Sequence, residues 1–172
     1  PANVLATGGN YLHKEIADVT TTHLEFPSGL RAHIFVSWLH PFKEQKLVVV
    51  GDRKMAVFDD TQPWTEKLRL YPHEITWKNH LPVPTKAEPE HVAMPQSEPL
   101  RLECQHFLEC LTANQPPLTG GAEGLRVLRI LNASQRSLDQ QGCKVPLKPV
   151  MGSAAPKDSG RPYFVHETAL ID

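Results

Sequence analysis

LRAHIFVSWLHPFKEQKLVVV, residues 30–50, is the most strand-like run of the sequence. In its first half, every second position is apolar; these positions are Leu30, Ala32, Ile34, Val36 and Trp38. This period of two is expected for a β-strand with two distinct faces. After a polar corner the chain continues as Lys46–Val50, which is apolar on both faces. We therefore predict a second strand there, placed in the centre of a sheet.

The corner between these two predicted strands, Trp38–Gln45, carries an unusual set of side chains. A connection between strands needs only turn-forming residues, whereas this one contains Trp38, His40, Lys43 and Gln45. Two interpretations stay open. In the first, Trp38 belongs to the core and the rest is a plain connection. In the second, His40 and Lys43 face an anionic or polyhydroxyl ligand, Trp38 offers a flat apolar wall, and Gln45 offers a directional amide.

The segments around this corner predict more antiparallel strands. Asn3–Thr7 and the threonine-rich Ile16–Phe26 are expected to pair as a hairpin, because β-branched side chains pack well on a pleated surface. Gly51-Asp52-Arg53 predicts a turn into a strand at Lys54–Asp59. Weaker strands are expected later in the chain, at Lys67–Tyr71, at Glu74–Trp77, and near His91–Met94 within the proline-rich stretch Asn79–Pro95.

Helical patterns follow after residue 97. Ser97-Glu98-Pro99 is typical of a helix start, and Leu100, Cys104, Phe107, Leu108 and Leu111 then recur at helical spacing. A second helix is expected from Ala122 to Gln141, ended by Gly142. The predicted fold class is therefore α+β: an open, mainly antiparallel sheet with two C-terminal helices packed on one face.

Composition excludes several classes of protein. The 172 residues carry a formal net charge of −1 without a basic run, which argues against a nucleic-acid or anionic-membrane partner. No apolar run approaches the roughly 20 residues of a membrane helix. Three cysteines are too few and too irregularly spaced for a disulfide framework or a zinc site, so we expect a cytoplasmic protein. The first residues resemble neither a signal peptide nor a natural start, so we expect a fragment of a longer protein.

The remaining motifs favour structural roles. Gly120–Gly124 precedes a predicted helix, but it does not follow a strand, so we interpret it as a turn and not as a phosphate loop. None of the nine histidines pairs with another at helical spacing, and we predict no metal site. Cys104 lies on the apolar stripe of its helix and is interpreted as a small hydrophobic residue.

Two longer segments carry a resemblance to a known family. Residues 6–51, ATGGNYLHKEIADVTTTHLEFPSGLRAHIFVSWLHPFKEQKLVVVG, resemble the start of the C-terminal domain of the Gfo/Idh/MocA oxidoreductases. EPLRLECQHFLEC and PPLTGGAEGLRVLRIL are similar to the closing helix pair of that family. The branch of this family that the sequence resembles most oxidises UDP-N-acetylglucosaminuronic acid at C3. The resemblance implies an N-terminal Rossmann domain that binds NAD, and a sheet whose free face packs against a sister subunit.

The resemblance also shows what the sequence lacks. The family's Glu-Lys-Pro motif is absent, since the only Glu-Lys here is Glu66-Lys67-Leu68, and so is its Asp-x-x-x-His helix. We therefore assign no catalytic residue and expect this chain alone to be inactive. We predict that Trp38, His40, Lys43 and Gln45 bind the sugar nucleotide, with Tyr11 and His13 nearby. These residues cluster at strand ends next to the expected Rossmann domain.

The domain boundaries follow from the same patterns. Residues 1–143 are predicted to form the oxidoreductase C-terminal domain and residues 144–162 a linker. Residues 163–172 resemble the start of a left-handed β-helix acyltransferase. Expected partners are the missing Rossmann domain, a UDP-sugar, and one or more further copies of the chain, as a homodimer or tetramer through the sheet face. The alternative is a non-catalytic dimerisation or scaffold domain that positions a fused sugar N-acyltransferase.

Overall fold

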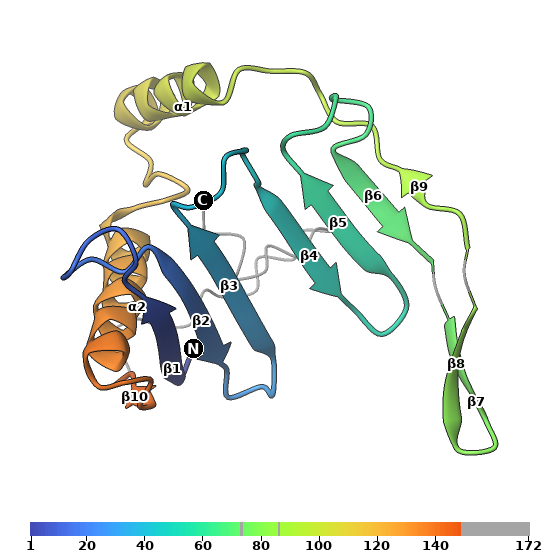
Figure 1. The fold of residues 1–172 in the computed structure, drawn as a ribbon. Helices are drawn as coiled ribbons and strands as arrows, with labels where there is room; N and C mark the ends of the chain where they lie inside the picture. The colour runs from blue at the N-terminus through green and yellow to red at the C-terminus, as the bar shows by residue number, and fades with distance from the viewer. Residues whose placement is uncertain (73, 86, 149–172) are drawn as a thin grey trace. The chain divides into compact units, whose positions relative to one another are not determined.

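A computed structural model of the chain describes residues 1–72, 74–85 and 87–148. The predicted acyltransferase start at residues 163–172, and most of the predicted linker, lie outside the described residues. The chain divides into two compact units (Figure 1). Unit 1 comprises Pro1–Leu39 and the chain from Pro116 onwards, and unit 2 comprises His40–Gln115.

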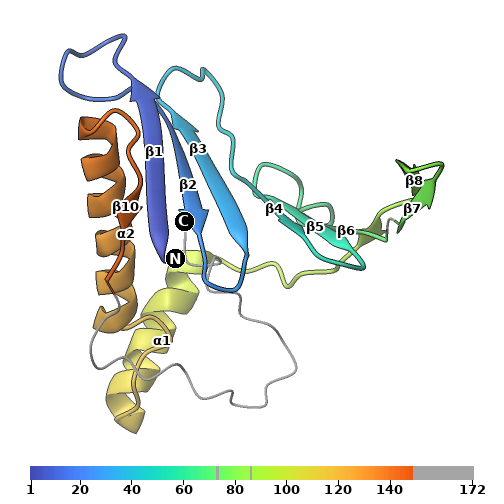
Figure 2. The same cartoon turned by 90° about the horizontal axis from the view of Figure 1, so that it is seen from below.

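Unit 1 contains an antiparallel sheet with the strand order β10-β1-β2-β3. These strands are β1 (Asn3–Gly9), β2 (Val19–Glu25), β3 (Arg31–Ser37) and the short β10 (Val145–Pro146). Helix α2 (Gly121–Asp139) lies along one face of this sheet (Figure 2). The core between them is formed by Val4, Leu24, Ala133 and Val145. Ordered structure thus continues past the predicted boundary at Cys143, because β10 pairs with the start of β1.

The strands of unit 1 confirm the hairpin predicted for the start of the chain. β1 pairs with β2 over its full length, from Asn3 opposite Glu25 to Gly9 opposite Val19. The turn between β2 and β3 contains Gly29 at a φ of 87°, a left-handed conformation that glycine adopts without steric cost. The Phe26 N–H donates to the Leu30 carbonyl across this turn at 3.1 Å, so the turn fixes the register of β3.

The hydroxyl of Ser137 joins α2 to the edge of β1. β10 pairs only with Asn3 and Val4, so it leaves the main chain of Ala6 without a strand partner on that edge. Ser137 Oγ accepts the Ala6 N–H at 2.8 Å and donates to the Cys143 carbonyl at 2.6 Å. The Ser137 side chain is fully buried. One hydroxyl therefore satisfies the strand edge and the segment that leaves the helix.

Unit 2 contains a second antiparallel sheet and a separate hairpin. The sheet has the order β4-β5-β6-β9, formed by β4 (Lys46–Val50), β5 (Met55–Asp59), β6 (Leu68–Tyr71) and β9 (Glu90–His91). β7 (Glu74–Lys78) and β8 (Leu81–Thr85) pair only with each other among the described residues. The β4–β5 hairpin was predicted. The central position predicted for Lys46–Val50 is wrong, because β4 is an edge strand whose residues are all exposed.

The two helices were predicted, and their ends differ in detail. α1 (Pro99–Ala113) has Pro99 in its first turn as expected, but its N-cap is Glu98 and not Ser97. None of its residues is buried in the described chain, so Cys104 is exposed and not part of a packed stripe. α2 ends at Asp139 with Gln140 as its C-cap, two residues before the predicted end at Gln141. Gly142 then has a left-handed φ of 85°, and its N–H donates to the Ser137 carbonyl at 2.8 Å.

The fold class predicted from the sequence is confirmed. The chain is α+β, with open antiparallel sheets and two helices. Within residues 1–72, 74–85 and 87–148, the strands form three sheets instead of the predicted one. No helix of the described residues combines the length and the hydrophobicity needed to cross a bilayer.

Replacing Ser137 with alanine should destabilise unit 1. The substitution removes the hydroxyl that accepts the buried Ala6 N–H and donates to the Cys143 carbonyl, and an unsatisfied buried donor costs about 1–3 kcal/mol of unfolding free energy. Chemical denaturation followed by circular dichroism measures this change. Ser134→Ala is the matched control, because the Ser134 hydroxyl donates to the Ile130 carbonyl of its own helix. Equal stability of the two variants would contradict the role given to Ser137.

Candidate functional site

The carboxylate of Asp18 organises the loop between β1 and β2. Its side chain is 5% exposed and accepts the main-chain N–H groups of Tyr11 and Leu12, the latter at 2.6 Å. The main chain of Asp18 also joins two strands, since its N–H donates to the Gly9 carbonyl and its carbonyl accepts the Trp38 N–H, both at 2.8 Å. One residue therefore connects the start of β2, the first loop and the end of β3.

These contacts favour the ionised form of Asp18. The hydrogen bond from Leu12, followed by that from Tyr11, lowers the pKa of Asp18 below its ordinary value, and burial opposes this shift. A carboxylate that accepts several main-chain N–H groups is stabilised in its charged state. Asp18 falls within the strand predicted at Ile16–Phe26, but β2 begins one residue later, and this role of Asp18 was not predicted. An acid that directly follows a polar loop is a signal for such side chain to main chain bonding.

Tyr11 and His13 lie on the loop held by Asp18. The Tyr11 side chain is 75% exposed, and its ring stands close to Gly9, where an added Cβ would lie 2.7 Å from the ring. His13 is exposed, and its Nδ1 accepts the Glu15 N–H at 3.1 Å. Tyr11 and His13, which were predicted to bind the substrate, thus both lie on a loop whose main chain is held by Asp18.

Trp38 lies at the end of β3 beside a shallow cavity. The side chain is 79% exposed, so the interpretation of Trp38 as a core residue is wrong. The cavity has a volume of about 280 Å³ and is lined by Ala17, Asp18, Thr20, Val36, Ser37 and Trp38. The indole therefore forms an open wall next to the buried carboxylate that positions Tyr11. A second cavity, of about 450 Å³, lies between the first loop and the C-terminal end of α2, and polar residues such as Asn10, Glu15 and Gln135 line it.

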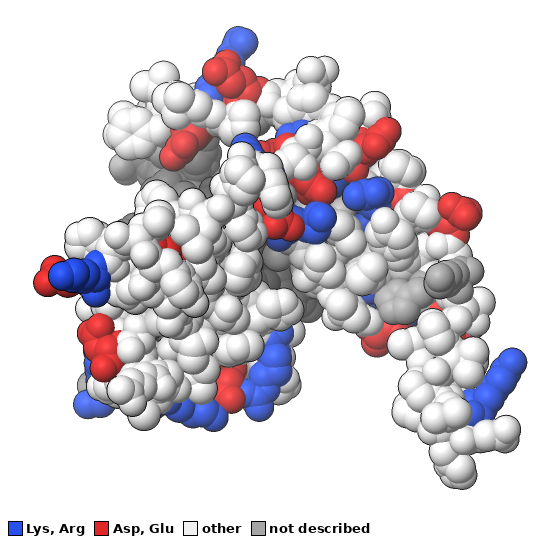
Figure 3. Space-filling model, viewed as in Figure 1, with Lys and Arg blue, Asp and Glu red and all other residues white. Residues whose placement is uncertain are grey.

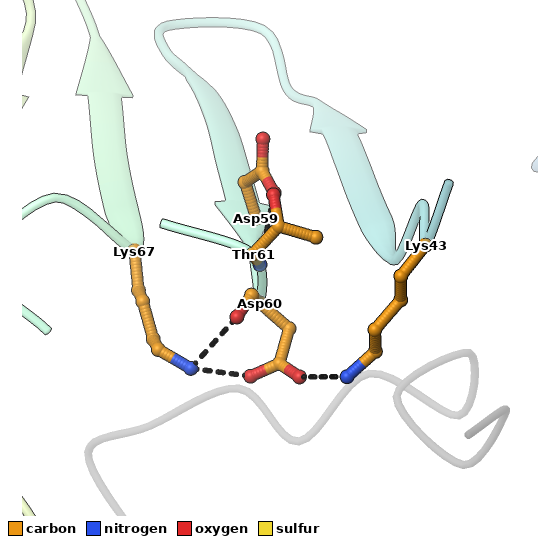
Figure 4. Close-up of polar contacts among 5 residues, drawn as sticks. All are labelled: Lys43, Asp59, Asp60, Thr61 and Lys67. Atoms are coloured by element: carbon orange, nitrogen blue, oxygen red, sulfur yellow. Dashed lines mark hydrogen bonds and ion pairs between the residues drawn. The ribbon is translucent and has the colours of Figure 1, made fainter. Parts of the chain in front are cut away.

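In unit 2, Lys43 belongs to a charged cluster that the sequence did not reveal (Figure 4). Its ammonium lies 3.3 Å from Asp60 Oδ2, and the ammonium of Lys67 pairs with the other oxygen of the same carboxylate. Lys67 also donates to the Asp60 carbonyl at 2.9 Å and lies over the Trp64 ring. The two ammonium groups, that of Lys67 foremost, lower the pKa of Asp60. Lys43 is therefore held in place by a carboxylate.

The neighbouring Asp59 is held by a separate set of contacts. It accepts the Thr61 hydroxyl at 2.6 Å and the Thr61 N–H at 3.1 Å, and Lys46 lies 3.5 Å away. The Thr61 hydroxyl is the main cause of its lowered pKa. The carboxylates of Asp59 and Asp60 thus contact three ammonium groups, those of Lys43, Lys46 and Lys67.

His40 and Gln45 lie at the two ends of the same corner. The His40 ring stacks on Phe42 at a centroid distance of 5.4 Å, and its Nδ1 lies 3.8 Å from Glu44. The Gln45 carbonyl accepts the Asp60 N–H at 3.0 Å, which leaves the side-chain amide of this exposed residue outside that contact. Of the predicted residues, unit 1 holds Tyr11, His13 and Trp38, and unit 2 holds His40, Lys43 and Gln45. Their role as ligands stays a prediction.

Three other features bear on ligand binding: the distribution of surface charge, the groups able to bind a metal ion, and the start of α2. On the face drawn in Figure 3, acidic and basic side chains are interspersed and form no extended field of one sign. No group of three or more His, Cys, Asp or Glu side chains suited to a metal ion occurs among the described residues. At the glycine run, the Gly120 N–H donates to the Glu123 carboxylate at 3.0 Å, so the start of α2 is capped by its own side chain.

Replacing Asp18 with asparagine should loosen the first loop in a pH-dependent way. Because the folded-state pKa of Asp18 lies below its ordinary value of 3.8, its stabilising effect is present above about pH 4 and disappears as the pH falls through the folded-state pKa. The gap in unfolding free energy between wild type and variant should therefore be largest near neutral pH and narrow in acid. Amide hydrogen exchange at Tyr11 and Leu12 should accelerate in the variant at neutral pH.

The exposed Asp52, which pairs with the neighbouring Arg53, provides the control for this measurement. Asp52→Asn should leave both the pH dependence and the exchange at Tyr11 and Leu12 unchanged. Unaltered exchange in Asp18→Asn would show that the carboxylate does not hold the loop.

Comparison with known proteins identifies the fold. No protein-family model matches the sequence, and no curated protein matches it. Among solved structures, UDP-N-acetylglucosamine 3-dehydrogenase GnnA from Acidithiobacillus ferrooxidans superposes with a TM-score of 0.62 at 18% identity over 80% of this chain. Levoglucosan dehydrogenase, solved with NADH and L-sorbose, gives a TM-score of 0.65 at 11% identity over 87% of this chain. The chain spans 40% and 45% of these two proteins, respectively. The chain shares its fold with part of these two dehydrogenases, and this fold resembles the Gfo/Idh/MocA C-terminal domain.

Proposed function

We propose that this chain is the substrate-binding and oligomerisation domain of an NAD-dependent sugar-nucleotide oxidoreductase, similar to a UDP-N-acetylglucosaminuronate 3-dehydrogenase. The observation that carries the proposal is the shared fold with two dehydrogenases whose names specify sugar substrates. Since the chain spans less than half of each, the remaining part of such an enzyme would supply the dinucleotide site and the reacting groups.

The geometry of unit 1 supports a sugar as ligand. The open indole face of Trp38 suits the apolar C–H face of a pyranose ring, and the adjoining cavity has the polar wall formed by Asp18, Thr20 and Ser37. Tyr11 and His13 would add directional hydrogen bonds from the loop that Asp18 fixes. Binding sites combine apolar surface with a few well-placed polar groups in this way.

The charged corner of unit 2 supports an anionic portion in the ligand. A diphosphate or a carboxylate could replace water around the Lys43 ammonium without breaking its contact to Asp60, because an ammonium has three donors. His40 and Gln45 flank this ammonium in the sequence and offer further polar atoms. An anionic sugar derivative, such as a sugar nucleotide, therefore suits this corner of unit 2 better than a neutral sugar.

The dinucleotide is assigned to a domain outside this chain. The glycine run at residues 120–124 does not fit a pyrophosphate, because the Glu123 carboxylate already accepts the Gly120 N–H at the start of α2. Its negative charge would repel a second anion at that position. We accordingly propose that NAD binds to a Rossmann domain, and that this chain alone performs no hydride transfer. The three free cysteines support a cytoplasmic setting.

Exposed apolar strands support a second role in oligomerisation. In unit 1, Phe35 and Val36 of β3 are more than half exposed. In unit 2, the exposed residues of β4 include Leu47, Val48, Val49 and Val50. Apolar surface of this kind marks interaction sites. We propose that it is covered by the missing domain and by further copies of the chain. A pure scaffold domain for an acyltransferase is the alternative, and the segment that suggests it lies outside the described residues.

Isothermal titration calorimetry with UDP-N-acetylglucosaminuronic acid distinguishes these two roles. The proposed function predicts saturable binding to the chain. Lys43→Ala should weaken this binding about tenfold or more, since it removes a charge-assisted contact worth about 1.5–3 kcal/mol. Trp38→Ala should weaken it as well, because it removes the apolar wall.

Two other residues supply matched controls. Lys54 pairs with Glu90 at 3.2 Å, much as Lys43 pairs with Asp60, and Trp77 is an equally exposed indole. Lys54→Ala and Trp77→Ala should leave the affinity unchanged. The absence of any saturable binding, or equal losses in the test and control variants, would favour the scaffold role.

A further inference from the structure

The β7–β8 hairpin of unit 2 stands apart from the sheet formed by β4, β5, β6 and β9 (Figure 1). Its two-residue turn, Asn79 and His80, has φ angles of 51° and 62°, as a type I′ turn requires. A two-stranded ribbon by itself is only marginally stable in water. The hairpin pairs with no other strand of the described chain, so it has two free edges.

The two free edges differ because of two prolines. In an antiparallel ladder, hydrogen-bonded and non-hydrogen-bonded pairs alternate, and the pair that closes a two-residue turn is hydrogen-bonded. The register places Lys78 opposite Leu81 at the turn, so Pro82 and Pro84 fall at positions whose main chain points away from β7. Proline has no N–H to donate. The outer edge of β8 is therefore blocked against a further strand.

The outer edge of β7 is open. Ile75 and Trp77 lie opposite Pro84 and Pro82, so their main-chain N–H and C=O groups also point outward. β7 contains no proline. The side chains of Ile75 and Trp77 are 53% and 71% exposed, so an apolar face adjoins this open edge.

The sequence of β7 is self-complementary about its central residue. Glu74-Ile75-Thr76-Trp77-Lys78 has opposite charges at its ends and apolar residues on both sides of the central threonine. If two such strands meet antiparallel with Thr76 on the two-fold axis, Glu74 faces Lys78 of the second copy and Ile75 faces Trp77 of the second copy. Opposite charges and aromatic–aliphatic pairs both stabilise neighbouring strands.

We propose that two copies of this chain associate through the outer edge of β7, forming a four-stranded sheet across a two-fold axis. Ile75 of each copy then forms a hydrogen-bonded pair with Trp77 of the other copy, because the main-chain N–H and C=O groups of both residues point outward. The contact uses one patch on both copies, as a two-fold dimer requires. It is independent of the proposed sugar-nucleotide function and of any association through the sheet faces.

Cross-linking at the two-fold axis tests this arrangement directly. In the full chain, with Cys104, Cys110 and Cys143 changed to serine, Thr76→Cys should form a disulfide with its own counterpart under mild oxidation. The two Cα atoms of a non-hydrogen-bonded pair lie about 4.5 Å apart, within the range that a disulfide spans. Glu74→Cys should not cross-link, since four residues of strand rise, about 13 Å, would separate the two thiols.

Charge reversal provides a second test that needs no cysteine. Glu74→Lys and Lys78→Glu each place like charges opposite one another twice in the dimer, and each should weaken self-association about tenfold in sedimentation equilibrium. The double variant E74K/K78E restores the opposite charges and should associate like wild type. An equimolar mixture of the two single variants should form heterodimers, because each pair then regains opposite signs.

Each outcome bears on the proposal. A Thr76→Cys disulfide confirmed by peptide mass spectrometry, together with restored association in the mixture, supports pairing through β7. Equal cross-linking of Glu74→Cys and Thr76→Cys would overturn it. So would single charge variants that associate like wild type, or a wild-type chain that stays monomeric in sedimentation equilibrium.

Discussion

The buried carboxylate of Asp18 is the constraint on which the candidate site depends. Its side chain fixes the main chain at Tyr11 and Leu12, and its carbonyl receives the N–H of Trp38. The first loop and the end of β3 are thus positioned by one residue at the start of β2. A loop without such an anchor would carry its polar side chains on a mobile main chain and would hold a ligand poorly. The N–H groups that keep this aspartate ionised are those that give the loop its shape.

Much of the fold followed from local patterns, because those patterns reflect interactions between near neighbours in the sequence. The β1–β2 and β4–β5 hairpins were predictable from strand-forming runs that follow one another closely in the sequence, and both are observed. β8 was missed because Pro82 and Pro84 argue against a strand, although prolines fit an outer edge. The prediction that β4 lies in the centre of a sheet was wrong. Apolar residues on both faces of a strand indicate that both faces contact other groups, but they do not show whether those groups belong to the same sheet.

The candidate site was predictable only in part, since its key contacts join residues distant from the predicted ones. The composition of the corner drew attention to Trp38 and Lys43, yet nothing in the sequence showed that Asp60 and Lys67 would bind to one another beside Lys43. The same holds for Ser137, which reaches Ala6 across most of the chain. Periodicity locates elements, whereas these contacts depend on which elements become neighbours.

Nuclear magnetic resonance tests the central claim most directly. The chain has three tryptophans, Trp38, Trp64 and Trp77, so three indole N–H signals report on three separate places. During titration with UDP-N-acetylglucosaminuronic acid, the account predicts a saturable shift of the Trp38 indole signal, while the Trp77 signal stays in place. A Trp38 signal that does not move at saturating ligand concentration would contradict a sugar-nucleotide site at the end of β3.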